Sequence, residues 1–291
     1  MTGVFVSGML LASPGSVGPA TAAAAQAPAA PRSGDASLEE RAADVSSLRA
    51  VEAEQWDDAL PLTLALIDGY TARPAYLARL AQIYNRMHRP VDEVATWERF
   101  MREAPRPGHA CPMVGKAYRG LGQYEHAIDA FTRCLAADSS NASLVYFVGL
   151  GHEWAGQFGP AREYYARAIV MAPPGYEARV SMARVNLHQN ALTAARDGAV
   201  AVLEDVPTHV EAALVAGLAE QRAGHRPEAR RHLELAAKLS PDYFDVRLAL
   251  GILEYSESRI PEARGHFESA FLSDPGRRAD VQPWLDRTTA K

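Results

Sequence analysis

The chain has 291 residues, enough for one large domain or two ordinary domains with a sizeable core. Although 48% of the residues are apolar, only 8% are aromatic and alanine is the commonest apolar residue, which favours helices packed closely through small side chains. The net charge of −5 argues against a general nucleic-acid binder, which needs a strongly basic face, so no nucleic-acid partner is expected.

The first 38 residues differ in composition from the rest of the chain. Val4–Ala12 is a short apolar run, and residues 21–31 read TAAAAQAPAAP, with small residues that suit a cleavage site. The run is too short to cross a bilayer as a mature helix, and we expect no transmembrane segment in the mature chain. The first basic residue is Arg32, whereas a signal peptide usually has one before its apolar run. We expect residues 1–38 to be a signal peptide or a disordered Ala/Pro-rich leader; a periplasmic or secreted location is favoured over a cytoplasmic one.

Over most of its length the chain repeats itself every 34 residues. Proline, alanine, glycine and bulky apolar residues each recur with this spacing. The columns are Pro105, Pro173, Pro207, Pro241 and Pro275; Ala59, Ala127, Ala161, Ala195, Ala229 and Ala263; Gly115, Gly149, Gly217 and Gly251; and Trp97, Phe131, Tyr165, Leu233 and Phe267. Apolar residues within a unit follow helical spacing, and the alternation typical of strands is not sustained, so the pattern predicts an all-α fold.

This pattern resembles the tetratricopeptide repeat family, in which each 34-residue unit is a helix–turn–helix. The repeat domain, residues 39–277, would hold seven units at 40–73, 74–107, 108–141, 142–175, 176–209, 210–243 and 244–277. Residues 278–291 start another first helix and would cap the stack. The resemblance implies an α-α superhelix, a solenoid of about seven repeats with a C-terminal capping helix.

Each column has an expected role in packing. Small residues let the two helices of a unit approach closely, and the bulky column is expected to fill the gap to the next unit. Two units depart from the pattern. Pro61 falls inside the second helix of the first unit and should strain it, and Glu93 takes the small-residue position of the second unit.

No motif in the sequence indicates catalysis. The stretches GLGQYEH, from Gly120, and GLGHEWAG, from Gly149, lack both the spacing of a phosphate loop and a preceding strand. The nine histidines have no zinc-site spacing, and no nucleophile elbow occurs. We therefore expect a protein that is not an enzyme and has no cofactor and no metal site.

The two cysteines, Cys111 and Cys134, are equidistant from the predicted turn at Gly122 and Gln123. They would therefore face each other across the helix pair of the third unit. One interpretation is a disulfide, if the protein is exported. The other is two buried thiols that fill space as small apolar groups, and this is favoured because it holds in either compartment.

By the resemblance, the first helices would line a concave groove for a segment of a partner protein. The family's groove positions give a basic stretch in units two and three and an apolar one in units four to seven. These candidate groove residues are Arg79, Gln82, Arg86, Lys116, Arg119, Phe147, Leu150, Trp154, Arg184, Leu187, Leu218, Arg222 and Ile252. A plainer interpretation also stands: acids at the starts of first helices and arginines near their ends satisfy the helix dipole alone.

The sequence thus predicts a non-catalytic scaffold that binds a partner protein, and it favours the envelope of a bacterium. The scarcity of lysine beside arginine is typical of bacterial genes of high GC content. One alternative is a cytoplasmic tetratricopeptide repeat adaptor. Another is a carbohydrate-binding or polysaccharide-export accessory protein that would use Tyr146, Phe147 and Trp154 as an aromatic platform.

Overall fold

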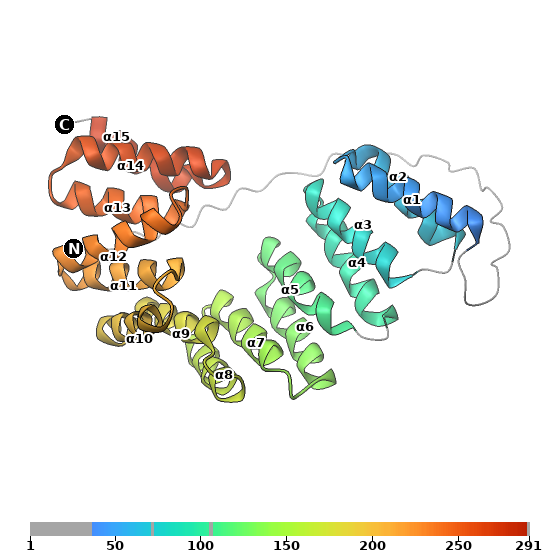
Figure 1. Cartoon of the computed structure of the whole chain (residues 1–291), viewed down its shortest axis with the longest axis horizontal. Coiled ribbons are helices and arrows are strands. Elements are labelled where there is room, and N and C mark those ends of the chain that lie inside the picture. Colours follow the sequence, from blue (N-terminus) through green and yellow to red (C-terminus); the bar gives the residue numbers. More distant parts are fainter. Residues whose placement is uncertain (1–36, 71–72, 105–106, 290–291) are drawn as a thin grey trace, which may run out of the picture.

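The computed structural model describes residues 37–70, 73–104 and 107–289 (Figure 1). The expected leader, residues 1–38, lies outside these ranges except for its last two residues. The described residues form fifteen α-helices and two short 3-10 helices, with no strand among them. The all-α prediction is confirmed.

The helices follow one another as seven pairs, each joined by a short turn. The pairs are α1 (Leu38–Glu52) with α2 (Trp56–Gly69), α3 (Pro74–Arg86) with α4 (Pro90–Glu103), α5 (Cys111–Gly120) with α6 (Tyr124–Ala137), α7 (Ala142–Trp154) with α8 (Phe158–Met171), α9 (Tyr176–His188) with α10 (Leu192–Asp205), α11 (Val210–Ala223) with α12 (Arg226–Leu239), and α13 (Phe244–Ser256) with α14 (Ile260–Ser273). The 3-10 helix η1 (Pro107–Ala110) precedes α5, and η2 (Pro275–Arg277) precedes α15 (Arg278–Thr289).

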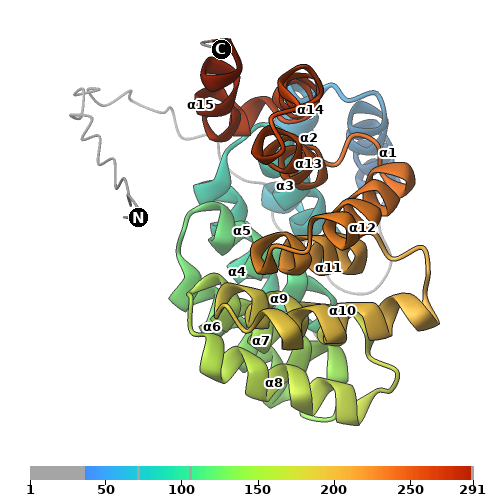
Figure 2. The ribbon, with the colours of Figure 1, turned by 90° about the vertical axis from the view of Figure 1, so that its left-hand side faces the viewer.

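The pairs are stacked along a curved path (Figures 1 and 2). Contacts between helices lie mainly between elements that are neighbours in the chain, as expected of a solenoid. In the middle of the curve, α5 and α7 lie on the inner side, whereas α6 and α8 lie on the outer side (Figure 1). The first helix of a pair is therefore the one that can line a concave surface.

The turn inside every pair has the same backbone geometry. One residue of each turn has a positive φ, at positions separated by 34 residues or a multiple of 34. These residues are Glu54, His88, Gly122, Gly156, Asn190, Gly224 and Ser258. The left-handed region favours glycine and costs other residues about 1–2 kcal/mol, yet four of the seven are not glycine. The geometry of the helix pair, rather than the residue type, therefore sets this turn.

The glycine column lies beneath the bulky column of the same unit. A Cβ atom added to Gly115 would lie 2.0 Å from Cζ of Phe131, and one added to Gly251 would lie 2.4 Å from Cε1 of Phe267. The other two contacts of this kind are Gly149 with Tyr165 and Gly217 with Leu233. All four bulky side chains are fully buried. Only glycine allows the backbone of the first helix to approach these side chains so closely.

The bulky column packs in two directions. It fills the space over the glycine of its own unit, which the sequence pattern did not assign to it. Phe131 also reaches the next unit, because its ring stacks on Phe147 with centroids 5.6 Å apart. The alanine column is fully buried as well, at Ala59, Ala127, Ala161, Ala195, Ala229 and Ala263.

The two units that depart from the pattern still form helix pairs. Helix α2 continues through Pro61, because the proline removes a hydrogen bond only from the carbonyl of Asp57, in the exposed first turn. Glu93 is buried at the small-residue position of α4, and its carboxylate accepts a hydrogen bond of 3.0 Å from Asn85 Nδ2. In the second pair, a hydrogen bond between Asn85 and Glu93 thus replaces the apolar packing that a small residue at this position allows in the other pairs.

Helix α15 covers the end of the last pair. The ring of Trp284 stacks on Phe267 with centroids 5.6 Å apart, and Val281 is fully buried against the same cluster. This helix therefore caps the stack.

We predict that Gly115→Ala lowers the free energy of unfolding by about 1–3 kcal/mol, because the new methyl group would overlap the ring of Phe131. Gly120→Ala in the same helix is the matched control: its Cβ has nothing within 4 Å, so the variant should keep or gain stability. Urea titration followed by circular dichroism measures both. Equal stability of the two variants would contradict the proposed role of the glycine column.

Candidate partner-binding groove

A hollow of about 810 Å³ runs across the first helices of five successive pairs, and we name it the central hollow. Helices α5, α7, α9, α11 and α13 each contribute side chains to it. The contributions repeat at helical spacing, as with Leu150 and Trp154 on α7 or Leu214 and Leu218 on α11, because residues four apart share a helix face. The first helices thus form one continuous surface.

The floor of the central hollow is apolar. Its leucine, isoleucine and tryptophan side chains are Leu150, Trp154, Leu187, Leu214, Leu218, Leu248 and Ile252. Leu187 and Leu214 are buried and the others are half-buried, so the floor is packed from below and open above. Covering this surface with a partner would be favourable, because apolar area would be removed from water.

Arg184 lies at the centre of an ion network in this hollow. Its Nε and Nη2 atoms donate to the carboxylate of Glu153 at 2.5 and 2.9 Å, and Nη1 donates to Glu211. Nη2 also donates to Ser181 Oγ at 3.1 Å, and the hydroxyl of Tyr165 donates to Glu153 at 2.5 Å. The network therefore ties together α7, α8, α9 and α11.

Tyr165 and Arg184 of the network both stay protonated at neutral pH. Burial raises the pKa of the Tyr165 hydroxyl, and the charge of Glu153 raises it further. Burial lowers the pKa of the Arg184 guanidinium, but the hydrogen bonds and the charge of Glu153 outweigh this, so the pKa lies above its usual value. Beside the network, burial holds the pKa of His188 below its ordinary value, so this ring is neutral.

Three cations of the central hollow are left without a carboxylate. Throughout residues 37–70, 73–104 and 107–289, no carboxylate lies within ion-pair distance of Lys116, Arg119 or Arg222. Arg119 lies over the ring of Trp154, with Cζ 4.9 Å from the centroid, and Arg222 donates to a backbone carbonyl. The acids of the hollow are engaged with Arg184 or, for Asp245, with Arg277 at 2.8 Å. The charge that remains for a partner is positive.

A further hollow of about 550 Å³, the N-terminal hollow, adjoins this surface. Gln82, Asn85 and Arg86 of α3 line it, and Lys116 lines both hollows. Exposed Glu52 and Glu54 also line the N-terminal hollow. The excess of unpaired positive charge is therefore confined to the central hollow.

Comparison with known families decides what kind of repeat this is. Two family models described as tetratricopeptide repeat match the chain, one at residues 154–208 and 214–277 and the other at residues 109–141. The chain belongs to the tetratricopeptide repeat family. Proteins with this fold are, in general, scaffolds for protein–protein interaction rather than catalysts. No curated protein matches the sequence significantly.

Solved structures show the same architecture. A tetratricopeptide repeat protein from Parabacteroides merdae is 13% identical, with a TM-score of 0.75 over 87% of this chain and 100% of that chain. The APC/C hetero-tetramer Cut9–Hcn1 gives 14% identity and a TM-score of 0.62 over 86% of this chain and 46% of that chain. At these identities the likeness establishes the fold alone.

Most residues expected in the groove of this tetratricopeptide repeat protein line one of the two hollows. The central hollow contains Lys116, Arg119, Leu150, Trp154, Arg184, Leu187, Leu218, Arg222 and Ile252, and the N-terminal hollow contains Gln82 and Arg86 together with Lys116. Arg79 and Phe147 line neither. The structure thus brings the basic and apolar stretches onto one surface. A few of these residues, however, make contacts within the scaffold instead of facing the hollow.

Arg79, Phe147 and Arg184 differ most from the sequence expectation. Arg79 is buried, where its guanidinium binds Asp44 at 2.7 Å and Ser47 Oγ at 3.0 Å, so it holds α3 against α1. Phe147 lies in a separate hollow and packs on Phe131. Arg184 is neutralised by its two glutamates. A cation at a groove position is therefore available to a partner only where no acid from a neighbouring unit reaches it.

Sequence reasoning missed the acids that neutralise Arg184. Glu211 lies in the first turn of a first helix, where the helix dipole alone accounts for an acid, but it also pairs with the arginine of the preceding unit. Glu153 lies in the last turn of α7. The one available signal was the spacing of each acid from Arg184, 27 and 31 residues, which is close to one repeat.

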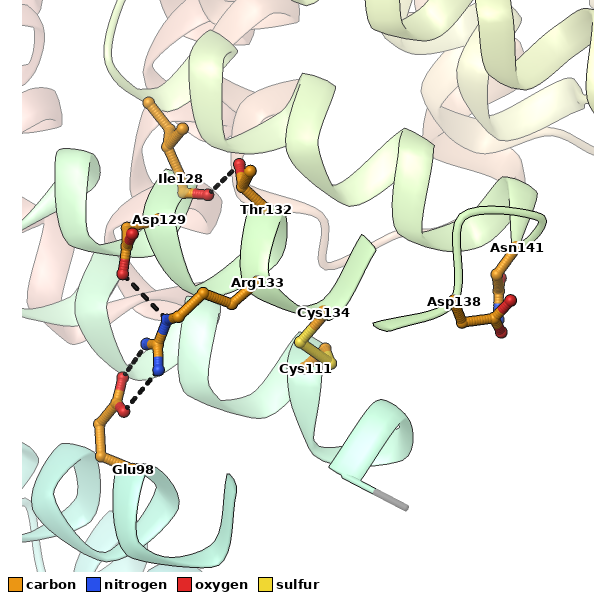
Figure 3. The surroundings of a disulfide bond; sticks show 9 residues. All are labelled: Glu98, Cys111, Ile128, Asp129, Thr132, Arg133, Cys134, Asp138 and Asn141. Carbon is orange, nitrogen blue, oxygen red and sulfur yellow. Dashed lines mark hydrogen bonds and ion pairs between the residues drawn. A yellow bond between two sulfur atoms is a disulfide. The ribbon is translucent and has the colours of Figure 1, made fainter. Parts of the chain in front are cut away.

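A disulfide closes the third helix pair (Figure 3). Cys111, the first residue of α5, is bonded to Cys134 in the last turn of α6, with their Cα atoms 6.3 Å apart. Both residues are buried. The structure thus differs from the favoured interpretation as two free thiols. The bond ties down the start of the helix that carries Lys116 and Arg119.

The aromatic residues near the groove do not form an open platform. Tyr146 packs on Tyr165 and Phe147 on Phe131, each with ring centroids 5.6 Å apart. One face of Trp154 is covered by Arg119. Each of these rings already packs on another side chain, so together they do not form an open platform for stacking on a sugar.

Two other kinds of site were sought in the described ranges. No cluster of three or more histidine, cysteine or acidic side chains there has a geometry suited to a metal ion. Among the helices that the structure describes, none combines the length and the hydropathy of a membrane span.

We predict that Cys111→Ala with Cys134→Ala lowers the free energy of unfolding by about 2–4 kcal/mol, because the disulfide restricts the unfolded chain. Thermal melting with and without a reducing agent measures the effect. The reductant should destabilise the wild type and leave the double variant unchanged. A wild type that melts at one temperature in both conditions would show that the bond does not contribute.

Proposed function

We propose that this chain is a scaffold that binds a segment of a partner protein along its central hollow, and that the segment carries carboxylates as well as apolar side chains. The observation that carries the proposal is a single surface built by the first helices of five successive pairs. A surface of this length suits an extended segment or a helix rather than a compact small molecule. Leucine and isoleucine side chains along the floor would supply most of the binding energy.

The unpaired cations support an acidic partner. Among the residues that the structure describes, no carboxylate pairs with Lys116, Arg119 or Arg222 of the hollow, and the net charge of the chain is −5. Complementary charges steer association and select among partners with similar apolar content. The Arg184 network supports the same conclusion, because it has already neutralised the nearest acids of the hollow.

We also propose that the scaffold works in an oxidising compartment, such as the bacterial periplasm. Disulfides persist in such compartments and are rare in the cytosol, and both cysteines of the chain are joined in one. The apolar run and the small residues of the first 38 positions are compatible with export. A cytoplasmic adaptor is the alternative that the following measurement distinguishes.

We expect the protein isolated from its own organism to begin between residues 23 and 30 and to carry the bonded cysteine pair. Mass spectrometry of the intact protein and of peptides from a non-reducing digest measures both. A chain that keeps Met1 and has two free thiols would contradict export and favour the cytoplasmic adaptor.

The groove can be tested without knowing the partner. Random peptides displayed on phage and selected on the immobilised chain should become enriched in peptides that combine Asp or Glu with apolar residues. For a selected peptide, we predict that Lys116→Glu weakens binding about tenfold or more, since an attraction becomes a repulsion.

Lys238→Glu is the matched control, because Lys238 is exposed on the second helix α12 and lines neither hollow. It should leave the dissociation constant unchanged, as measured by calorimetry. If Lys116→Glu binds as tightly as Lys238→Glu, the central hollow is not where the segment lies. If the selection enriches no peptide, the scaffold proposal itself fails.

A further inference from the structure

A third hollow, of about 380 Å³, lies at the junction of the fourth and fifth helix pairs. It lies between the first turns of α7 and α9 and is closed by the end of α8; we name it the side slot. Its walls are almost entirely apolar, and the rings of Tyr146, Phe147 and Tyr176 form much of them. Ligand pockets in proteins usually have volumes of about 300–1,000 Å³, so the slot is large enough for a bulky side chain.

The slot is open because three positions at this junction carry very small residues. These are Ala168, Ala172 and Gly175. One repeat later the same positions hold Val202, Val206 and His209, and two repeats later they hold Ala236, Ser240 and Tyr243. His209 turns back onto the start of α11, where its Nδ1 atom accepts from the backbone N–H of Ala212 at 3.3 Å. The fifth unit thus has larger side chains at all three of these positions, and the sixth unit has them at two of the three.

The slot adjoins the central hollow. Tyr146 lines both, so a segment lying in the central hollow can direct one side chain past this ring into the slot. The walls are already held in place: Phe147 stacks on Phe131, Tyr146 packs on Tyr165, and the Tyr146 hydroxyl lies 3.4 Å from Ser181 Oγ. A preformed pocket avoids the entropic cost of ordering its side chains on binding.

The rim of the slot carries the opposite charge to the unpaired cations of the central hollow. Glu177, in the first turn of α9, has a side chain that is 72% exposed, and one of its carboxylate oxygens lies 3.9 Å from Nε2 of His209. A basic residue beside the side chain in the slot would pair with this carboxylate. The two charged regions together would give a bound segment one preferred direction.

We propose that the side slot binds one aromatic side chain of the partner segment, with a lysine or arginine next to it at Glu177. This inference rests on the proposed function, since it assumes that a segment lies in the central hollow. Aromatic walls favour an aromatic occupant through offset or edge-to-face contacts. Buried aromatic anchors in pockets of this kind commonly dominate the energetics of an interface.

The test uses a peptide selected on the full chain and four measurements of its dissociation constant. Ala172→Leu fills the slot with a larger side chain, and because Ala172 is exposed the variant should fold. Ala194→Leu, on the exposed surface of α10, is the matched control. The peptide is used with its aromatic residue intact and with that residue replaced by alanine, and circular dichroism confirms equal helicity of the proteins.

We expect wild-type selection to enrich peptides with an aromatic residue next to Lys or Arg. The intact peptide should bind Ala172→Leu at least about tenfold more weakly than Ala194→Leu, and the alanine peptide should bind both variants equally. If replacing the aromatic residue with alanine weakens binding to both variants by the same factor, that residue lies outside the slot and the inference is wrong.

The outcomes also separate this inference from the proposed function. The selected peptides could need Lys116 for binding and yet carry no aromatic residue, or they could bind Ala172→Leu as tightly as the control. Either result would contradict the proposal for the side slot and leave the scaffold proposal intact. An absence of any selected peptide would overturn both.

Discussion

The structure depends on the close approach, in four of the seven pairs, between a glycine of the first helix and a bulky side chain of the second helix. At Gly115 a single added carbon would lie 2.0 Å from the ring of Phe131. Because protein interiors are as densely packed as organic crystals, this contact sets the distance between the two helices within a narrow range. It occupies one face of the first helix, so a neighbouring face is left to line the hollow. The groove is thus a consequence of how each pair packs.

Stacking the pairs then decides which charges remain available. The Arg184 network joins α7, α8, α9 and α11, and breaking one partner of such a buried pair is usually costly because it leaves a charge unpaired. A cation that looks like part of a binding surface is therefore part of the scaffold. No carboxylate in the described ranges reaches Lys116 or Arg222, and in the proposed function these two cations recognise the partner. Arginine thus serves the scaffold on α9, whereas the cations proposed for binding lie on the other first helices α5 and α11.

The repeat pattern could be predicted well because each unit meets the same environment as its neighbours. Ala127 and Ala161 are both fully buried in equivalent contacts, so the same residue recurs and the period is visible. The positive φ of the turn could not be predicted in this way. Glu54, His88, Asn190 and Ser258 adopt the same positive φ as the turn glycines, because the geometry of the pair imposes it on any residue there. The side slot could not be predicted from the sequence either. Ala168 and Ala172 are common residues in helices, and only the structure shows which side chains surround them.

By itself the sequence determined the all-α repeat, the pairing of helices and the family, because these depend on contacts that recur every 34 residues. Only the tertiary structure decided which side chains face a partner. Arg79 and Arg184 stand at groove positions like Lys116, yet acids from neighbouring units reach the first two. Such interactions depend on distances between residues far apart in the chain, and those distances exist only once the pairs are stacked.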